Sequence, residues 1–194
     1  MRNVVLKLGL LQDALTIYQD EMDRCRTNGA YWALLHITVC LPDICAALQS
    51  PNGKTTRQLY ENWCDLYLPN ALLLGKERYR MRCKVLHQGR ATTDQPSSRY
   101  IGFSFGQPSP AGHVDHLRVD ARCLNVDVGR LADETQNGVV QWAKSVEAKP
   151  RSDDAMHVFK NLSSLVRVRQ LPFPISAPAG IPGMSQFATT LKTS

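Results

Sequence analysis

The first part of this chain carries an apolar stripe that constrains the fold more than any other feature. Apolar residues recur there at alternating intervals of four and three, and the charged residues lie off the stripe. The stripe consists of Val4, Leu8, Leu11, Leu15, Tyr18, Met22 and Cys25. Such spacing predicts a helix of about six turns. Asn28-Gly29 then ends it, because glycine tolerates the positive φ found after many helices.

Two more helices are predicted directly after this first one. Residues 30–49 are apolar on nearly every side, which predicts a buried helix rather than an amphipathic one. The longest apolar run, residues 30–41, is too short to cross a bilayer. Thr55 or Thr56 can cap a third helix that reaches Tyr67.

A fourth helix is predicted over about residues 71–87, and a fifth over residues 126–146. Gly129 and Gly138 weaken the fifth helix by roughly 1 kcal/mol each relative to alanine. The chain is therefore predicted to be mainly α, folded as an antiparallel helical bundle.

The region after residue 89 changes in character. Residues 100–105 alternate large and small side chains, and residues 117–124 resemble a returning strand, so we expect a β-hairpin inserted at about residues 98–125. This places one helical domain at residues 1–150. Residues 151–194 are predicted to form a C-terminal extension, partly irregular, that ends in an extended, proline-rich arm.

Composition indicates a soluble globular protein with a mild preference for anionic partners. Of the 194 residues, 43% are hydrophobic and 21% charged, and the formal net charge is +6. The six cysteines form no C-x-x-C pair, and most lie in apolar helical runs where a reduced thiol acts as a small hydrophobe. With no secretion signal recognised, we expect a cytoplasmic protein that does not engage a membrane.

Several histidines and tryptophans have structural interpretations. His113-x-x-His116, with Asp115, Asp120 and Cys123 nearby, has ligand types suited to a metal, but it lacks a second conventional ligand pair. We therefore expect no metal and no cofactor. His36 is interpreted as a core histidine with a backbone partner. The tryptophans are interpreted as core residues rather than base-stacking platforms: Trp32, Trp63 and Trp142.

The segment Tyr79-Arg80-Met81-Arg82-Cys83-Lys84-Val85-Leu86-His87-Gln88-Gly89 points most clearly to chemistry. It combines fixed cations with a side chain that exchanges protons near neutral pH. Residues seven apart on a helix are nearly in line, whereas residues five apart are rotated by about 140°. Arg80 should therefore share a face with His87. Arg82 should not, unless the helix loosens or its partner comes from a second chain.

Arg82, four intervening residues and His87 resemble the R-x(4–6)-H motif of the HEPN superfamily, the higher eukaryotes and prokaryotes nucleotide-binding domains. The helical context is similar too, with a long first helix, a buried second helix and the motif late on a helix. The resemblance covers about residues 4–146. Residues 41–45 and 83–89 also look like those of uncharacterised bacterial HEPN-like proteins.

The resemblance implies a homodimer in which two such motifs face one cleft and cut RNA without a metal. RNA supplies its own nucleophile, the 2′-hydroxyl, so a proton-transfer group and a fixed cation suffice. His87 would move the proton, and Arg82 would hold the non-bridging oxygens. Arg80 and Lys84 would bind flanking phosphate. The products would carry 2′,3′-cyclic phosphate and 5′-hydroxyl ends.

Asp43 follows Pro42 within the second helix, where a buried carboxylate needs a partner. Arg82 and His87 are candidates, but hydrogen bonding to backbone freed by Pro42 is slightly favoured.

Two functions stay open. The first is an endoribonuclease in a toxin–antitoxin or phage-defence setting, controlled by an antitoxin or regulatory protein. The second is a catalytically inactive scaffold that binds RNA, a nucleotide or a protein. Cys83 motivates the second, because HEPN ribonucleases usually carry a polar residue after the arginine.

Overall fold

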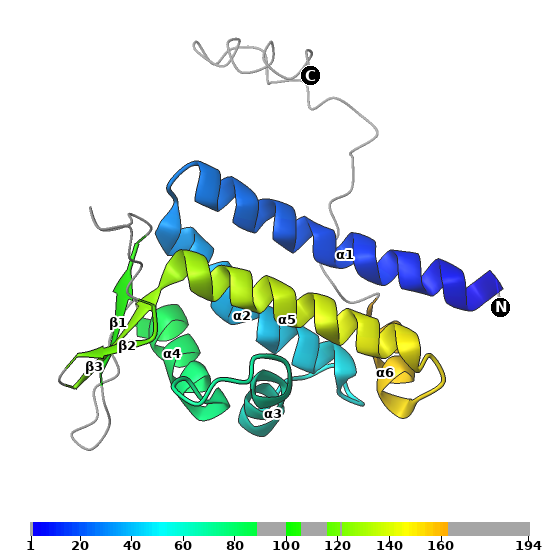
Figure 1. The fold of residues 1–194 in the computed structure, drawn as a ribbon. Coiled ribbons are helices and arrows are strands. Elements are labelled where there is room, and N and C mark those ends of the chain that lie inside the picture. The colour runs from blue at the N-terminus through cyan, green and yellow to red at the C-terminus, as the bar shows by residue number, and fades with distance from the viewer. Residues whose placement is uncertain (1, 89–99, 106–115, 121, 163–194) are drawn as a thin grey trace, which may run out of the picture.

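The computed structural model describes residues 2–88, 100–105, 116–120 and 122–162, which form a helical bundle with a small sheet at one end (Figure 1). The elements in chain order are α1 (Arg2–Thr27), α2 (Tyr31–Gln49), α3 (Arg57–Tyr67), α4 (Gly75–Gln88), β1 (Tyr100–Ser104), β2 (Arg118–Asp120), β3 (Cys123–Asp127), α5 (Val128–Ala148) and α6 (Asp153–Asn161). The prediction of a mainly helical protein is therefore confirmed.

The centre of the bundle is α2, which packs against each of the other five described helices. In Figure 1, α1 lies on one side of α2 and α5, and α3 and α4 lie on the other side. The figure also places α6 and the sheet at opposite ends of the bundle. The site discussed below lies where α4 packs on α2.

The prediction that α2 is buried on nearly every side is only partly correct. Trp32 is 41% exposed, so one stripe of the helix faces solvent. The helix is also longer than its most apolar run, and by length and composition it could cross a membrane. Half of that stretch is buried within the fold, where α2 packs against the other described helices.

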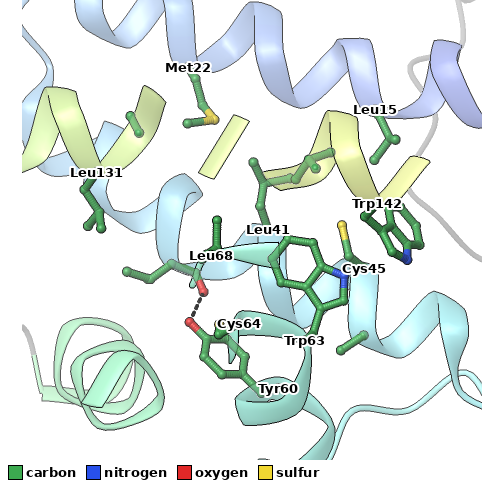
Figure 2. Packing of buried hydrophobic residues seen from close by; sticks show 14 of the residues in the cluster. Leu15, Met22, Leu41, Cys45, Tyr60, Trp63, Cys64, Leu68, Leu131 and Trp142 are labelled. Carbon is green, nitrogen blue, oxygen red and sulfur yellow. Dashed lines mark hydrogen bonds between the residues drawn. The ribbon is translucent and has the colours of Figure 1, made fainter. Parts of the chain in front are cut away.

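Side chains from all six described helices form the core around α2, and Figure 2 shows part of this cluster. The Trp63 and Trp142 rings meet edge to face, with their centroids 6.5 Å apart. The Tyr60 hydroxyl donates a hydrogen bond to the backbone oxygen of Val39 at 3.3 Å, so this polar atom is satisfied within the core. Trp63 and Trp142 are therefore core residues, as predicted.

The start of α4 differs from the prediction. The helix begins at Gly75, because residues 71–74 form a turn around Asn70. The Asn70 side chain accepts from the Leu72 N–H at 2.9 Å. The Asp65 carboxylate accepts from the Gly75 N–H at 2.7 Å and fixes the first residue of α4 against α3. The third helix begins as expected, with Thr56 as its cap.

The predicted hairpin between residues 100–105 and 117–124 is wrong. The second segment is divided between β2 and β3, and the sheet order is β1-β3-β2. β1 pairs with β3 in parallel, whereas β2 and β3 are antiparallel. This arrangement sets Ile101 beside Leu124 and Phe103 beside Val126, so both buried apolar residues of β3 have partners from β1. Burial of these side chains, rather than a tight turn, decides the pairing.

β3 runs directly into α5, so Val126 belongs to the strand and not to the helix. The Asp127 carboxylate caps α5 by accepting from the Arg130 N–H at 2.8 Å. At the far end, α6 packs against α2 and α5, so residues 153–161 join the bundle. The rest of the predicted C-terminal extension, residues 163–194 with the proline-rich arm, lies outside the described residues.

Gly138 of α5 packs against the end of α3, and this contact predicts the effect of adding a methyl group. A Cβ at this position would meet the Leu68 side chain and lie 2.8 Å from the backbone oxygen of Tyr67. We expect Gly138→Ala to lower the free energy of unfolding, because overpacking costs about 1–3 kcal/mol. That cost exceeds the roughly 1 kcal/mol that alanine gains in helix propensity. Urea denaturation measures the difference.

Asn137→Ala is the matched control, because this neighbouring side chain is exposed. Its effect should stay within about 0.5 kcal/mol. A Gly138→Ala protein as stable as the wild type would contradict the packing described here.

Candidate functional site

Arg82 of α4 contacts both Asp43 and His87, the two residues with which the sequence analysis associates it. Its Nη2 atom donates to the Asp43 Oδ2 atom of α2 at 2.6 Å. Its Nη1 atom lies 3.4 Å from the Nε2 atom of His87, one turn further along α4. The described structure thus brings a carboxylate, a guanidinium and an imidazole together within one chain.

The contact between Arg82 and His87 overturns the expectation drawn from ideal helix spacing. Five residues of separation rotate the two Cα positions well apart, but the long arginine side chain reaches round the helix to the imidazole. Arg80, which spacing favoured, is half-buried, and no contact among the described residues joins it to His87. Lys84 is half-buried in the same part of α4.

Asp43 pairs with Arg82, so the favoured interpretation of its role, hydrogen bonding to backbone freed by Pro42, is wrong. Its carboxylate lies 2.6 Å from the guanidinium, and both side chains are about four-fifths buried. The Thr55 hydroxyl donates to the backbone oxygen of Asp43 at 2.6 Å. The turn before α3 therefore helps to hold this part of α2 in place.

The electrostatics of the cluster keep Arg82 charged. Partial burial opposes the charge, but the hydrogen bond and the negative charge of Asp43 raise the pKa of Arg82 overall. A guanidinium can only donate hydrogen bonds, so a hydrogen bond between these two residues requires the Nε2 atom of His87 as the acceptor. The Nε–H of Arg82 is buried and has no partner among the described residues.

Cys83 belongs to the same neighbourhood. A hydrogen bond between Tyr79 and Cys83 is the main reason why the pKa of Tyr79 is raised, and burial adds to the effect. The Cys83 Sγ atom also lies 4.0 Å from the Nη1 atom of Arg82. The residue that departs from the usual HEPN pattern thus contacts the candidate site arginine.

A second ionic cluster, which no sequence pattern indicates, anchors α4. Arg78 is buried, and its guanidinium donates to the backbone oxygen of Leu73 and to the Glu134 carboxylate at 3.1 Å. His116 donates from Nε2 to the same carboxylate at 2.9 Å, and its Nδ1 accepts from the Asp127 N–H. Burial raises the pKa of Glu134, but these hydrogen bonds and charges lower it overall.

This cluster accounts for His116 without a metal ion. His113 and Asp115 lie outside the described residues, and within the described part no three suitable side chains gather as a metal site. His36 is not a core residue, because it is half-exposed beside the exposed Trp32, with ring centroids 5.0 Å apart. The expectation of a backbone partner is correct, since the Nδ1 atom of His36 lies 2.8 Å from the Trp32 oxygen.

Comparison with protein-family models, with curated proteins and with solved structures finds no match. The resemblance to HEPN proteins therefore depends on the motif and its helical frame alone.

Proposed function

We propose that the protein is a metal-independent endoribonuclease of HEPN type. The observation that carries the proposal is the shared guanidinium of Arg82, which lies 3.4 Å from the Nε2 atom of His87 and is held by Asp43. A base beside a fixed cation is the equipment that phosphodiester cleavage by the 2′-hydroxyl requires. The net charge of +6 favours an RNA partner.

In the proposed reaction, the phosphate replaces His87 as the partner of the Arg82 Nη1 atom, and the freed Nε2 atom of His87 takes the proton of the 2′-hydroxyl. The 2′-oxygen then forms a bond to phosphorus, and the bond to the 5′-oxygen breaks. The leaving oxygen takes a proton from an acid, for which a homodimer supplies the histidine of the second copy. Arg82 stabilises the charge that develops on the non-bridging oxygens. The products carry 2′,3′-cyclic phosphate and 5′-hydroxyl ends.

Asp43 has a positioning role in this scheme. Its carboxylate fixes the Arg82 guanidinium beside His87, which removes rotamer freedom from a long side chain. Arg80 and Lys84 lie on the same helix and would contribute positive charge along the path of the RNA.

A scaffold that binds RNA, a nucleotide or a protein without cutting is the second candidate. Asp43 offsets the charge of Arg82, and Cys83 stands where HEPN ribonucleases usually have a polar residue. Such a protein would bind RNA with an affinity that falls steeply with salt, and it would yield no products.

The setting that fits the first candidate is a cytoplasmic toxin or phage-defence nuclease, held in check by an antitoxin or regulatory protein. Growth arrest on expression, rescued by His87→Ala, would support this setting. A homodimer in sedimentation experiments would support the two-site cleft.

The test of the proposed function uses the 2′-hydroxyl itself. In the presence of EDTA, the protein should cut single-stranded RNA, and a 2′-deoxy substitution at each mapped cut position should abolish cleavage there. The reason is that the substitution removes the nucleophile but keeps the phosphate. Gel electrophoresis of end-labelled oligonucleotides measures both rates. Equal cleavage of the two substrates would contradict the proposed mechanism.

A further inference from the structure

A hollow of about 370 Å³ opens beside Arg82, on the side where α2, the turn before α3 and α4 meet. Its polar lining comes mainly from the following side chains: Asp43, Lys54, Thr55, Thr56, Arg57 and Arg82. The proposed reaction uses only Arg82 and Asp43 from this set. The volume falls in the range of pockets that hold small molecules, so there is room for more than a single ion.

Positive charge dominates the wall of this hollow. Three cationic side chains face one carboxylate, that of Asp43. Among the described residues the ammonium of Lys54 has no ion-pair partner. Arg57 uses its Nε atom for Glu61 at 2.6 Å, which leaves its remaining N–H donors for a ligand. An anion entering the hollow would therefore meet cations from two sides.

The hydrogen-bond donors that line the hollow suit a phosphate ligand better than the carboxylate of a protein side chain. The Thr56 hydroxyl accepts from the Leu59 N–H, so its own hydrogen can be donated to a ligand oxygen. The Arg57 guanidinium carbon lies 5.7 Å from the centre of the Tyr79 ring, which restricts its motion. Several donors gathered around one hollow match a group with several acceptor oxygens.

We propose that this hollow binds a backbone phosphate of single-stranded RNA next to the bond that is cut. Arg82 lies in the wall of the hollow and also contacts His87, so the two sites share one cation. A strand whose phosphate is held by Lys54 and Arg57 would present its neighbouring linkage to His87. This inference rests on the proposed function for its substrate, but its binding step does not require cleavage.

The test measures binding of a fluorescent oligonucleotide with 2′-O-methyl groups, which cannot be cut by the 2′-oxygen. Fluorescence anisotropy is recorded over a range of salt for wild type, Lys54→Gln and Arg57→Gln. Each variant should bind roughly fivefold more weakly at low salt. Each lost phosphate contact should also reduce, by about 0.7, the slope of the logarithm of the binding constant against the logarithm of the salt concentration. Lys149→Gln and Arg130→Gln are matched controls, because both residues are exposed and lie outside the hollow.

The outcomes separate this inference from the proposed function. If the two pocket variants bind as tightly as their controls, the inference fails, even for a protein that cuts RNA. If they bind more weakly in a protein that never cuts RNA, the hollow stands as a phosphate site and the nuclease proposal fails. Titration with AMP forms the second arm. If the two pocket variants lose AMP binding but bind the oligonucleotide as tightly as the wild type, the hollow is a site for a free nucleotide. That result would overturn the proposal that it binds an RNA phosphate.

Discussion

His87→Ala should slow RNA cleavage by a factor of about 100 to 10,000, the usual contribution of a general base or acid. The imidazole is exposed at the end of α4, and its described contact is with Arg82, so its removal leaves the core intact. The thermal unfolding midpoint should therefore change little. Cleavage rates under single-turnover conditions, measured in EDTA, test the prediction.

His157→Ala provides the matched control for loss of a histidine. His157 lies on α6, and Figure 1 places this helix at the opposite end of the bundle from the sheet. The His157→Ala protein should cut RNA at the wild-type rate. If His87→Ala and His157→Ala cut at the wild-type rate, the proton-transfer role of His87 would be excluded.

Glu134→Ala should lower the free energy of unfolding by about 3 kcal/mol or more, because it leaves a buried cation without its carboxylate. The Arg78 side chain is only 3% exposed, and Glu134 is its ion-pair partner. The same change removes the acceptor of the His116 Nε2–H hydrogen bond. Loss of this anchor should also loosen α4, which carries Arg82. Chemical denaturation measures the free energy.

Asp133→Ala is a strict control, since it removes the neighbouring carboxylate from the same helix. Asp133 pairs with Arg26 at 2.6 Å, but the two side chains are 42% and 37% exposed. Such a pair contributes about 0–1 kcal/mol. Equal losses from the two substitutions would contradict the distinction between a buried and a surface ion pair.

The free energy of unfolding should also depend on pH through the ionisation of Glu134. The pKa of Glu134 is lowered in the folded protein, so its contribution is complete above the ordinary glutamate pKa. It is lost as the pH falls through the lowered value. Unfolding of the wild type should therefore become easier in this acid range, and Glu134→Ala should show a weaker dependence there.

Periodicity was sufficient to predict most helices, because each buries a continuous face. The stripe ending at Cys25 became α1, and Gly29 follows it with a φ of 68°. The third helix and its Thr56 cap followed from local rules of the same kind. The start of α4 was missed because Asn70 and Asp65 organise the preceding turn through side-chain hydrogen bonds.

Contacts between distant residues were beyond sequence reasoning. The Arg82–Asp43 pair joins positions 39 residues apart, and it depends on how α4 packs on α2. The network of Arg78, Glu134 and His116 likewise exists only after folding. Parallel pairing of β1 with β3 could not be inferred either, because both segments show the same alternation as a hairpin.

The exposed aromatic pair on α2 shows a different limit. Composition placed Trp32 and His36 in the core, since the surrounding residues are apolar on all sides of the helix. No described element covers that stripe of α2 completely, and Trp32 remains 41% exposed. Hydrophobicity alone cannot tell which face of such a helix lacks a neighbour.

The end groups of the RNA products test the central claim most directly. Wild-type protein is incubated with a single-stranded RNA in EDTA, and the new 3′ ends are identified by mass spectrometry, with His87→Ala in parallel. Attack by the 2′-hydroxyl predicts 2′,3′-cyclic phosphate ends that are nearly absent from the His87→Ala reaction. Products with 3′-hydroxyl ends, or cyclic ends formed equally by both proteins, would contradict a site built on Arg82 and His87.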